Sequence, residues 1–393
     1  MSTSTNTFAS HYPVTGEVIA NYPIADRETV FNAVVAARSA SSAWQDLGFK
    51  GRRKVLLKWS NLLISQLDEI TELVSRETGK PVSDAKLEAS LAVGHLGWAA
   101  RHAEDVMRTS HRTPGALMAN MSATVERSPV GVVGVIGPWN YPIFTPMGSI
   151  SYALAAGNTV VFKPSEYTPG VGAILAKTFA EVAPDANVFI CVTGLGATGK
   201  DLCESGVDKL AFTGSTRTAK LVAAACAANM TPVVLECGGK DPVIVDEDAD
   251  IKRAADATIW SSMSNAGQTC IGAERVYVHE KVADKFIEEA IKVAKSIHPG
   301  APGVGNYGPA TMPSQIHVIQ GHIDDAIAKG AKVALGGSDS VKAPFVEPVI
   351  LLDVPESSTA MLEETFGPTI AINRVKSMDE AIALSNASKY GLG

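Results

Sequence analysis

Apolar side chains recur every three or four residues from Asp26 to about Ser110, the spacing that gathers them on one face of a helix. The pattern predicts three amphipathic helices. Gly79-Lys80-Pro81 is expected to end the second helix, and Ser83 is placed to cap the third. The apolar positions are Val30, Val34 and Ala37, then Val55, Leu56, Leu62, Leu63, Leu67 and Leu73, then Leu87, Leu91, Leu96 and Ala99.

The pattern changes after a segment of polar and turn residues at 109–128. Short apolar runs rich in β-branched residues now alternate with helical stretches that start near Thr145, Pro169, Lys200 and Thr216. Such strands, separated by helices, predict a parallel sheet that is buried on both faces. The expected strands are 131–136, 159–162, 188–192, 209–212 and 233–235.

A second alternating set begins near Pro242 and predicts a second α/β domain. Its expected strands are 243–245, 275–278, 346–352 and 369–374, and its expected helices are 251–263, 282–297 and 314–329. The chain stops at Tyr390-Gly391-Leu392-Gly393, directly after a helical pattern, where a glycine normally turns the chain into its next element. We therefore expect the sequence to be a fragment.

Length and charge narrow the class of protein. With 393 residues the chain exceeds the size at which one core keeps growing, so two domains are expected. The net charge of -7, with Lys and Arg scattered among acidic residues, leaves no basic stripe for nucleic acid. The N-terminus is polar, which argues against a signal peptide, and the most apolar stretch, 130–136, is too short to span a bilayer. A soluble, cytoplasmic protein without nucleic-acid or membrane partners is expected.

The cysteines and histidines do not predict a disulfide framework or a metal site. The five cysteines are odd in number and show no CxxC spacing, and the eight histidines form no HxxxH or HExxH group. We expect no metal and a reducing compartment.

Two residues suggest covalent catalysis. Cys270 follows the small polar turn Asn265-Ala266-Gly267-Gln268-Thr269, and Glu236 stands upstream in Leu235-Glu236-Cys237-Gly238-Gly239-Lys240. A lone cysteine is more often a buried small hydrophobic residue than a nucleophile. Together with a carboxylate that can act as a base, it makes a candidate catalytic pair.

Two glycine-containing turns are candidates for binding phosphate. The motif at 194–199 matches GxGxxG, but it lacks the full crossover helix and the acidic residue at the end of the next strand, which favours a plain Gly-rich turn. Gly214-Ser215 is the better candidate, because it opens a helix from Thr216 whose unpaired N–H groups face an anion. An ordinary capped helix explains that turn equally well.

Two further strand ends carry polar groups. Lys163-Pro164-Ser165-Glu166 closes a strand, and Lys163 and Glu166 are able to reach ribose hydroxyls; the alternative is a solvated turn with an exposed ion pair. Gly137-Pro138-Trp139-Asn140-Tyr141-Pro142 closes another. There the prolines fence the Asn140 amide, a fixed donor of the kind an oxyanion hole requires. The alternative is an asparagine that serves only its own turn.

Taken together, these motifs resemble the aldehyde dehydrogenase superfamily in order and spacing, and the likeness extends from Pro13-Val14-Thr15-Gly16 to the last residue. The motifs that carry it are Gly137-Pro138-Trp139-Asn140-Tyr141-Pro142, Lys163-Pro164-Ser165-Glu166, Phe212-Thr213-Gly214-Ser215, Glu236-Cys237-Gly238-Gly239-Lys240, Gly267-Gln268-Thr269-Cys270 and Glu363-Glu364-Thr365-Phe366-Gly367-Pro368. One departure is Cys237, where leucine is usual.

The resemblance implies a role for each matching residue. Cys270 corresponds to the nucleophile, Glu236 to the general base and Asn140 to the oxyanion donor. NAD is expected, since Glu166 would repel a 2′-phosphate, and NADP is the alternative that Lys163 and Ser165 tolerate. The residues expected to bind the cofactor are Pro138, Trp139, Lys163, Ser165, Glu166, Gly199, Phe212, Thr213, Gly214, Ser215, Glu364 and Phe366.

The resemblance also implies the fold and assembly. A Rossmann-like NAD(P)-binding domain is expected at 1–108 and 129–237, an oligomerisation hairpin at 109–128, and a catalytic α/β domain at 238–393 whose C-terminal part is missing. A homodimer or homotetramer is expected of the full-length protein.

The expected reaction oxidises an aldehyde to a carboxylic acid through a thiohemiacetal and a thioester on Cys270, which water activated by Glu236 then hydrolyses. Two alternatives stay open: a cysteine esterase activity, and a truncated relic that binds dinucleotide without turnover. Tyr141, Phe144, Trp260, Thr269 and Ile271 are candidates for lining an apolar tunnel, but they do not identify the aldehyde.

Overall fold

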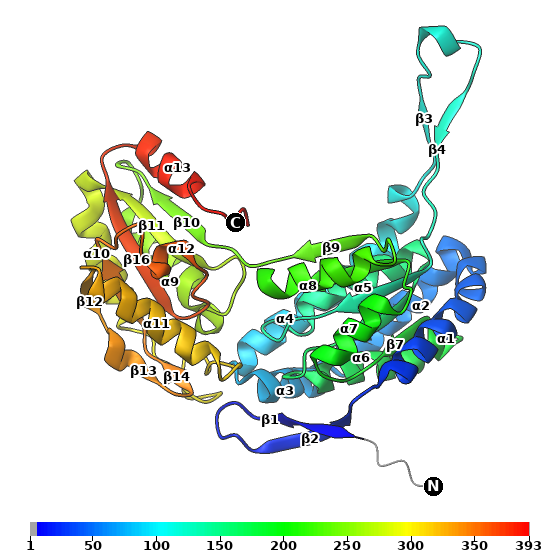
Figure 1. Ribbon diagram of the computed structural model, residues 1–393, viewed down its shortest axis with the longest axis horizontal. Helices are drawn as coiled ribbons and strands as arrows, with labels where there is room; N and C mark the ends of the chain where they lie inside the picture. Colours follow the sequence, from blue (N-terminus) through cyan, green and yellow to red (C-terminus); the bar gives the residue numbers. More distant parts are fainter. Residues whose placement is uncertain (1–5, 393) are drawn as a thin grey trace. The chain divides into compact units, whose positions relative to one another are not determined.

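Five parallel strands form the first sheet of the protein. The computed structural model describes residues 6–392 (Figure 1). They lie in the order β7-β6-β5-β8-β9, and every neighbouring pair is parallel. All five strands expected before residue 237 are thus confirmed. Their bounds are β5 (Val132–Ile136), β6 (Thr159–Lys163), β7 (Phe189–Cys191), β8 (Lys209–Thr213) and β9 (Val233–Glu236).

The helices of this sheet divide between its two faces. Crossovers between parallel strands are right-handed, so a chain that runs outward from β5 to β7 and then returns to β8 and β9 changes face. This rule places α5 (Phe144–Ala156) and α6 (Pro169–Ala180) on one face, and α7 (Gly196–Glu204) and α8 (Thr216–Ala227) on the other. Helices therefore lie on both faces, and β5 and β6 are buried as predicted, but β9 is partly exposed, with Val234 41% exposed.

Aromatic side chains fill the core beneath α6. The rings of Trp59 and Phe179 meet edge to face with centroids 5.1 Å apart, and Phe189 lies 5.8 Å from Trp59. The indole N–H of Trp59 donates to Thr178 Oγ1 at 3.0 Å, and that of Trp44 donates to the carbonyl of Leu154 at 3.0 Å. Both indoles are buried with their polar atoms satisfied.

The N-terminal region forms four helices instead of the predicted three. The second predicted helix is interrupted at Gln66, whose φ of -104° and ψ of 15° leave the helical region. Gly79-Lys80-Pro81 separates the last two helices as expected, but the final helix begins before Ser83, which is therefore not its cap. The helices are α1 (Arg27–Asp46), α2 (Gly48–Ser65), α3 (Leu67–Thr78) and α4 (Val82–Val106).

A second five-stranded sheet has the order β10-β11-β16-β15-β12, with β12 antiparallel to β15. Successive residues of β11 point to opposite faces: Val276 and Val278 pack in one core and Tyr277 in the other. The strands are β10 (Asp241–Val245), β11 (Ala273–His279), β12 (Lys332–Leu335), β15 (Val349–Leu352) and β16 (Thr369–Val375).

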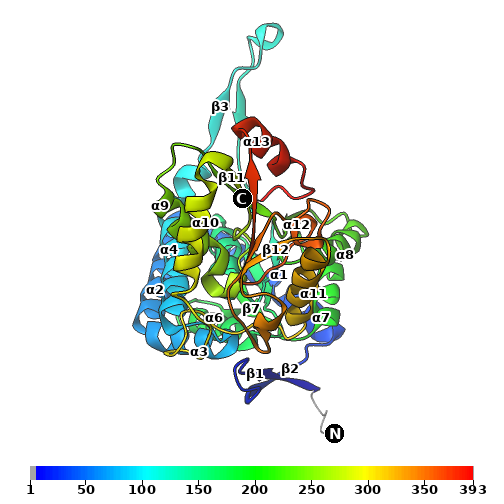
Figure 2. The same cartoon turned by 90° about the vertical axis from the view of Figure 1, so that its left-hand side faces the viewer.

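Helices cover both faces of this second sheet (Figures 1 and 2). One core joins it to α9 (Ile251–Met263) and α10 (Glu280–Ala294), and the other joins it to α11 (Gln315–Ala328), α12 (Thr359–Leu362) and α13 (Met378–Asn386). The predicted strand at 346–352 was wrong in extent, because Pro348 separates β15 from β14 (Phe345–Val346).

Three hairpins complete the architecture. They pair β1 (Thr7–His11) with β2 (Val18–Pro23), β3 (Ser110–Arg112) with β4 (Ala123–Val125), and β13 (Val341–Lys342) with β14. The β3–β4 hairpin lies within 109–128 and projects from the first unit (Figure 1).

The chain forms two compact units. The first holds residues up to Ser10, Ala20–Leu73 and Lys86–Glu236, and the second holds His11–Ile19, Val74–Ala85 and the residues from Cys237 onward. Most of the polar N-terminal segment, in which no signal peptide is expected, lies outside the described residues. Over residues 6–392, no helix combines the length and apolar character needed to cross a membrane.

Alanine substitution should have opposite effects on stability at two glycines, one on α5 and one on α6. A Cβ at Gly172 would lie 2.5 Å from Pro164 Cγ, whereas one at Gly148 meets nothing within 4 Å. Gly172→Ala should destabilise the first unit by about 1–3 kcal/mol through overpacking. Gly148→Ala should stabilise it by about 0.5–1 kcal/mol through helix propensity. Urea unfolding of the two variants measures both; equal effects would contradict the packing described for α6.

Candidate functional site

The carboxyl ends of the first sheet bring most of the predicted cofactor residues to one edge. The strand order reverses direction between β5 and β8, and ligands of open α/β sheets bind beyond the carboxyl ends of strands at such a switch point. The segment 137–140 follows β5, and Thr213-Gly214-Ser215 closes β8. Lys163 ends the neighbouring β6 and Glu236 ends the outer β9, so four separate motifs share this edge.

Lys163 is the buried cation of this edge. Its side chain is 4% exposed, its Nζ donates to the carbonyl of Pro164 at 3.0 Å, and it lies 3.7 Å from a carboxylate oxygen of Glu166. Burial lowers the pKa of Lys163, and Glu166 opposes that shift. The carboxylate of Glu166 is 40% exposed, so the pair has one buried and one accessible member. The solvated ion pair considered as an alternative is therefore wrong for Lys163.

Gly199 lies beneath the Lys163 side chain. A Cβ on Gly199 would meet Lys163 Cδ at 3.5 Å, which is ordinary contact distance. α7 starts at Gly196, so the GxGxxG segment opens a nine-residue helix rather than a long crossover. The structure thus gives Gly199 a packing contact with a predicted cofactor residue.

Ser215 caps α8. Its hydroxyl accepts from Thr218 N at 3.3 Å, while Gly214 N donates to the carbonyl of Glu236 at 3.1 Å. Ser215 is exposed, as are Thr216 and Arg217 after it. The cap and the anion site remain compatible, since one side chain satisfies only one of the N–H groups at a helix start.

Asn140 and Glu236 differ in burial. Asn140 is 7% exposed and lies in the segment between β5 and α5, with Pro138 and Trp139 partly buried before it. This segment is held at its far end by Glu88 Oε1, which accepts from Ile143 N at 2.9 Å. Glu236 is exposed at the end of β9, an edge strand of the sheet.

Cys270 lies in the second unit, after a turn of unusual backbone geometry. Asn265, Ala266 and Gly267 take successive φ values of 53°, 58° and 70° in the left-handed region. A non-glycine residue there costs about 1–2 kcal/mol, so the turn needs hydrogen bonds that stabilise it. Gln268 supplies them: its side chain donates to the carbonyls of Asn265 and Pro309 at 2.9 and 3.2 Å and accepts from Thr311 N at 2.8 Å.

Three sequence motifs pack together around this turn. Glu364 Oε1 accepts from Gly239 N at 3.2 Å, and a Cβ on Gly238 would lie 2.2 Å from Glu364 Oε2. A Cβ on Gly267 would lie 2.1 Å from the carbonyl oxygen of Gly367, and one on Gly239 would lie 2.9 Å from that of Cys270. At Gly267 and Gly239 the close neighbour is a backbone carbonyl, so a side chain there would prevent these contacts; at Gly238 it is the carboxylate end of the Glu364 side chain, which can move.

The surroundings of Cys270 disfavour its thiolate in the cofactor-free protein. Burial raises the pKa of the thiol, the backbone N–H of Cys270 lowers it, and the carboxyl groups of Glu364 and Asp241 raise it further. Burial also raises the pKa of Glu364 and that of Asp241 to about 7 each, with Glu274 adding to both shifts. Neither oxygen of Asp241 has a hydrogen-bond partner in the described part of the chain.

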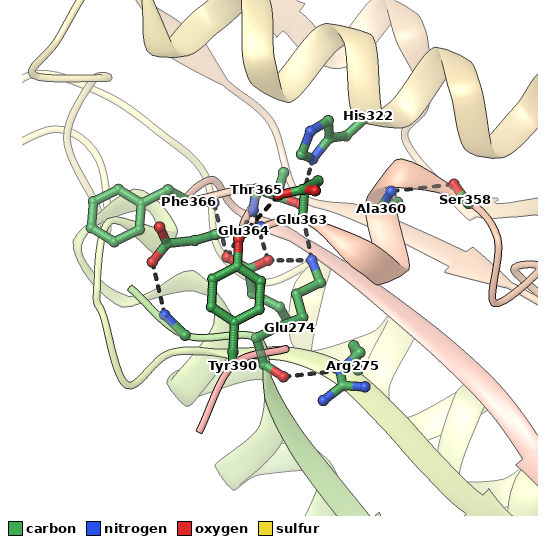
Figure 3. A network of polar contacts seen from close by, with 12 residues as sticks. Glu274, Arg275, His322, Ser358, Ala360, Glu363, Glu364, Thr365, Phe366 and Tyr390 are labelled. Atoms are coloured by element: carbon green, nitrogen blue, oxygen red, sulfur yellow. Dashed lines mark hydrogen bonds and ion pairs between the residues drawn. The ribbon is translucent and has the colours of Figure 1, made fainter. Parts of the chain in front are cut away.

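The sequence analysis missed one group of this region. Glu274 is buried in β11, pairs with Lys240 and accepts hydrogen bonds from the backbone of Thr365 and Phe366 (Figure 3). The available signal was a pair of charged residues, Glu274 and Arg275, at the start of a strand whose next three residues are apolar or aromatic. Trp260 and Ile271, expected to line a tunnel, are 71% and 61% exposed. Among residues 6–392, no cluster of His, Cys, Asp or Glu is arranged to hold a metal ion.

The model of the "Aldehyde dehydrogenase family" matches residues 1–393. The chain is 38% identical over 384 residues to a glutarate-semialdehyde dehydrogenase of Pseudomonas putida, covering 97% of this chain and 79% of that protein. It is 36% identical over 386 residues to the NADP(+) succinate-semialdehyde dehydrogenase GabD of Escherichia coli, again covering 97% and 79%.

Solved structures give the same likeness. An NADP-dependent enzyme of E. coli superposes with a TM-score of 0.94 at 34% identity, covering 98% of this chain and 81% of that one. An aldehyde dehydrogenase of Brucella melitensis has a TM-score of 0.93 at 34% identity, with coverage of 98% and 80%. These values support the α/β fold with its parallel sheets.

The raised pKa of Cys270 predicts how its alkylation depends on pH. Only the thiolate reacts, so the rate of modification by iodoacetamide in the cofactor-free protein should rise about tenfold per pH unit from pH 7 toward 9. Mass spectrometry of the peptide that contains Cys270 measures the rate. Cys203 and Cys226, whose pKa values burial also raises, are internal controls. A rate that levels off near pH 7 would contradict the burial effect.

The carboxyl group of Glu364 predicts a pH dependence of stability. Its pKa rises from 4.5 to about 7 on folding, so the folded state binds more protons and its free energy of unfolding falls as pH increases across that interval. Glu364→Gln removes this dependence, so its melting temperature should gain on that of the wild type between pH 5 and 8. Glu288→Gln, at an exposed position on α10, is the control for loss of charge. Parallel pH profiles for Glu364→Gln and the wild type would refute the assignment.

Proposed function

The chain belongs to the aldehyde dehydrogenase family, and from this premise we propose that Cys270, Glu236 and Asn140 are the residues with which it oxidises an aldehyde to a carboxylic acid, using a nicotinamide dinucleotide. The observation that carries the assignment is the packing of Glu364 and Gly367 onto the segments that flank Cys270. Motifs that are far apart in the sequence there enclose one partly exposed thiol. A cysteine that served only the core would need no such surroundings.

In the proposed reaction the Cys270 thiolate attacks the aldehyde carbon, and a thiohemiacetal forms on its sulfur. The Asn140 amide and the backbone N–H of Cys270 stabilise the oxyanion, for which loss of one donor typically costs about 3–4 kcal/mol. Because burial raises the pKa of the free thiol, this step needs further activation when the cofactor and substrate are present. A nicotinamide dinucleotide bound here would supply the hydride acceptor for this oxidation, and Cys270 would then hold the acyl group as a thioester.

Glu236 is assigned the second half of the reaction. Its exposed carboxylate at the end of β9 is free of the packing that surrounds Lys163 and is suited to activate a water molecule. Attack of that water on the thioester releases the acid and regenerates the thiol. A carboxylate at this position favours hydrolysis over transfer of the acyl group to another thiol.

We assign the cofactor to the carboxyl edge of the first sheet and to Glu364 and Phe366. What supports this is the exposed start of α8 at Ser215, which suits a phosphate, and the Lys163 and Glu166 pair, which suits ribose hydroxyls. Pro138, Trp139, Ser165, Gly199, Phe212, Thr213 and Gly214 complete the proposed set. NAD is preferred in this proposal, because the accessible carboxylate of Glu166 would repel the 2′-phosphate of NADP.

The substrate is proposed to be a semialdehyde. The two relatives described above are named for glutarate semialdehyde and succinate semialdehyde, and this chain covers 79% of each. We further propose that residues 1–108 and 129–237 serve the cofactor, that 238–393 serve catalysis, and that the hairpin within 109–128 joins copies of the protein into a dimer or tetramer. Leu117 on that hairpin is 98% exposed, which supports a contact role.

Because Cys270 and Glu236 are assigned different steps, their variants should lose different parts of the reaction. Glu236→Gln should still form about one equivalent of reduced dinucleotide per active site in a rapid burst and then stall, because the thioester is not hydrolysed. Cys270→Ala should lose both burst and turnover, by about a thousandfold or more. Stopped-flow absorbance at 340 nm with succinate and glutarate semialdehydes, and with NAD and NADP, measures both variants.

The same measurements on the wild type and on Cys270→Ala distinguish an aldehyde dehydrogenase from an esterase and from a protein that only binds dinucleotide. Turnover retained by Cys270→Ala would defeat the assignment. Hydrolysis of a p-nitrophenyl ester without any aldehyde oxidation would instead indicate an esterase. Thermal stabilisation by NAD without turnover would indicate a protein that only binds dinucleotide.

A further inference from the structure

Glu274 is a charged residue inside a fully buried strand. All seven residues of β11 are buried, and Glu274 itself is 7% exposed. A carboxylate at such a position is costly unless ion pairs and hydrogen bonds replace the water it loses. Its partners therefore indicate what the residue does.

Those partners are one lysine and two backbone amides. Lys240, 1% exposed, forms an ion pair with Glu274 Oε2. Thr365 N donates to the same oxygen at 2.8 Å, and Phe366 N donates to Oε1 at 2.9 Å (Figure 3). Two successive N–H groups that converge on one anion form the arrangement known as a nest, which defines the local backbone direction.

The backbone held in this way has an unfavourable conformation. Phe366 has a φ of 54°, in the left-handed region that a bulky side chain rarely occupies. Such a residue keeps its conformation only where its surroundings impose it, and residues strained in this way are often found at binding sites. The hydrogen bond from Phe366 N to Glu274 is a contact that imposes it here.

Thr365 is held from several sides at once. Lys240 Nζ donates to its hydroxyl at 3.2 Å, and His322 Nδ1 lies 3.0 Å from the same oxygen. Gln315 Nε2 donates to its carbonyl at 2.7 Å. With Thr365 anchored, the side chains on either side of it, Glu364 and Phe366, point away from His322 (Figure 3).

We propose that Glu274 is a positioning residue for cofactor binding: its carboxylate, paired with Lys240, sets the backbone of Thr365 and Phe366 and so presents Glu364 and Phe366 to the dinucleotide. The inference rests on the proposed function in one respect, the assignment of Glu364 and Phe366 to the cofactor. The setting of the backbone is a separate claim that is measured without any ligand.

Glu274→Gln tests the inference in the full chain. A glutamine keeps the shape of the side chain but has one acceptor oxygen and no charge, so the two amides lose a charge-assisted partner. Hydrogen–deuterium exchange of the peptide around Thr365 and Phe366, without ligand, should be about tenfold faster or more. The dissociation constant for NAD, or for NADP if the wild type prefers it, should rise by about tenfold, measured by calorimetry.

Tyr307→Phe is the matched control. Tyr307 belongs to the same unit and is 2% exposed, and its hydroxyl donates to the carbonyl of Val346 at 2.8 Å, away from the Glu364–Phe366 segment in sequence. It should lower the melting temperature while leaving both exchange near Thr365 and dinucleotide affinity unchanged. If exchange and affinity followed the melting temperature in both variants, Glu274 would be a stabilising residue only, and the proposal would fail.

A double variant separates positioning from simple charge compensation. Lys240→Met with Glu274→Leu removes both buried charges and should recover much of the stability lost by Glu274→Leu alone. Exchange near Thr365 should nevertheless stay fast, because the amides still lack an acceptor. Exchange that returned to the wild-type rate would overturn the proposal.

The experiments distinguish failure of the proposed function from failure of the positioning role of Glu274. A wild type that binds neither NAD nor NADP would refute the proposed function, and the exchange measurements would still decide whether Glu274 sets the segment. Faster exchange with unchanged dinucleotide affinity would overturn the link between this segment and the cofactor.

Discussion

Close approach of one backbone to another is the constraint on which the surroundings of Cys270 depend. The carbonyl oxygen of Gly367 approaches Gly267, and that of Cys270 approaches Gly239, at distances that leave no room for a Cβ. The strained turn before Cys270 is stabilised by the side chain of Gln268, which also joins it to the distant residues Pro309 and Thr311. Replacing the glycines would not merely crowd the site, since it would separate the segments that together form it.

A buried ion pair also shapes the same unit. Lys240 and Glu274 lose their hydration, and the ion pair between them together with backbone amides replaces it. The cost of this arrangement is seen in neighbouring groups, because Glu274 helps to raise the pKa of Glu364 and of Asp241 to about 7. Geometry and protonation are thus coupled around Cys270: the carboxylate that orders the Thr365–Phe366 backbone also makes nearby carboxyl groups easier to protonate.

In the first unit it is the strand order that brings the candidate cofactor residues together. The reversal of strand order between β5 and β8 brings four strand ends to one edge, and the helix α8 adds an exposed N-terminus there. Little backbone strain is needed, since each motif simply follows its strand. The cost in this unit is instead a buried charge: burial lowers the pKa of Lys163, and Glu166 counters that effect.

The sequence by itself determined the elements and the class of chemistry. The period of two or of 3.6 in apolar positions marks strands and helices, and the motifs, by their resemblance to aldehyde dehydrogenases, indicate an enzyme that uses a nicotinamide dinucleotide. Local pattern did not predict the break at Gln66 or the division around Pro348, where no strong change of period accompanies the boundary. Only the tertiary structure decided that Glu274, Lys240 and Thr365 meet, because partners 34 and 91 residues from Glu274 leave no local signature. Burial likewise sets the pKa values of Cys270 and Glu364, and burial belongs to the folded chain rather than to any segment of it.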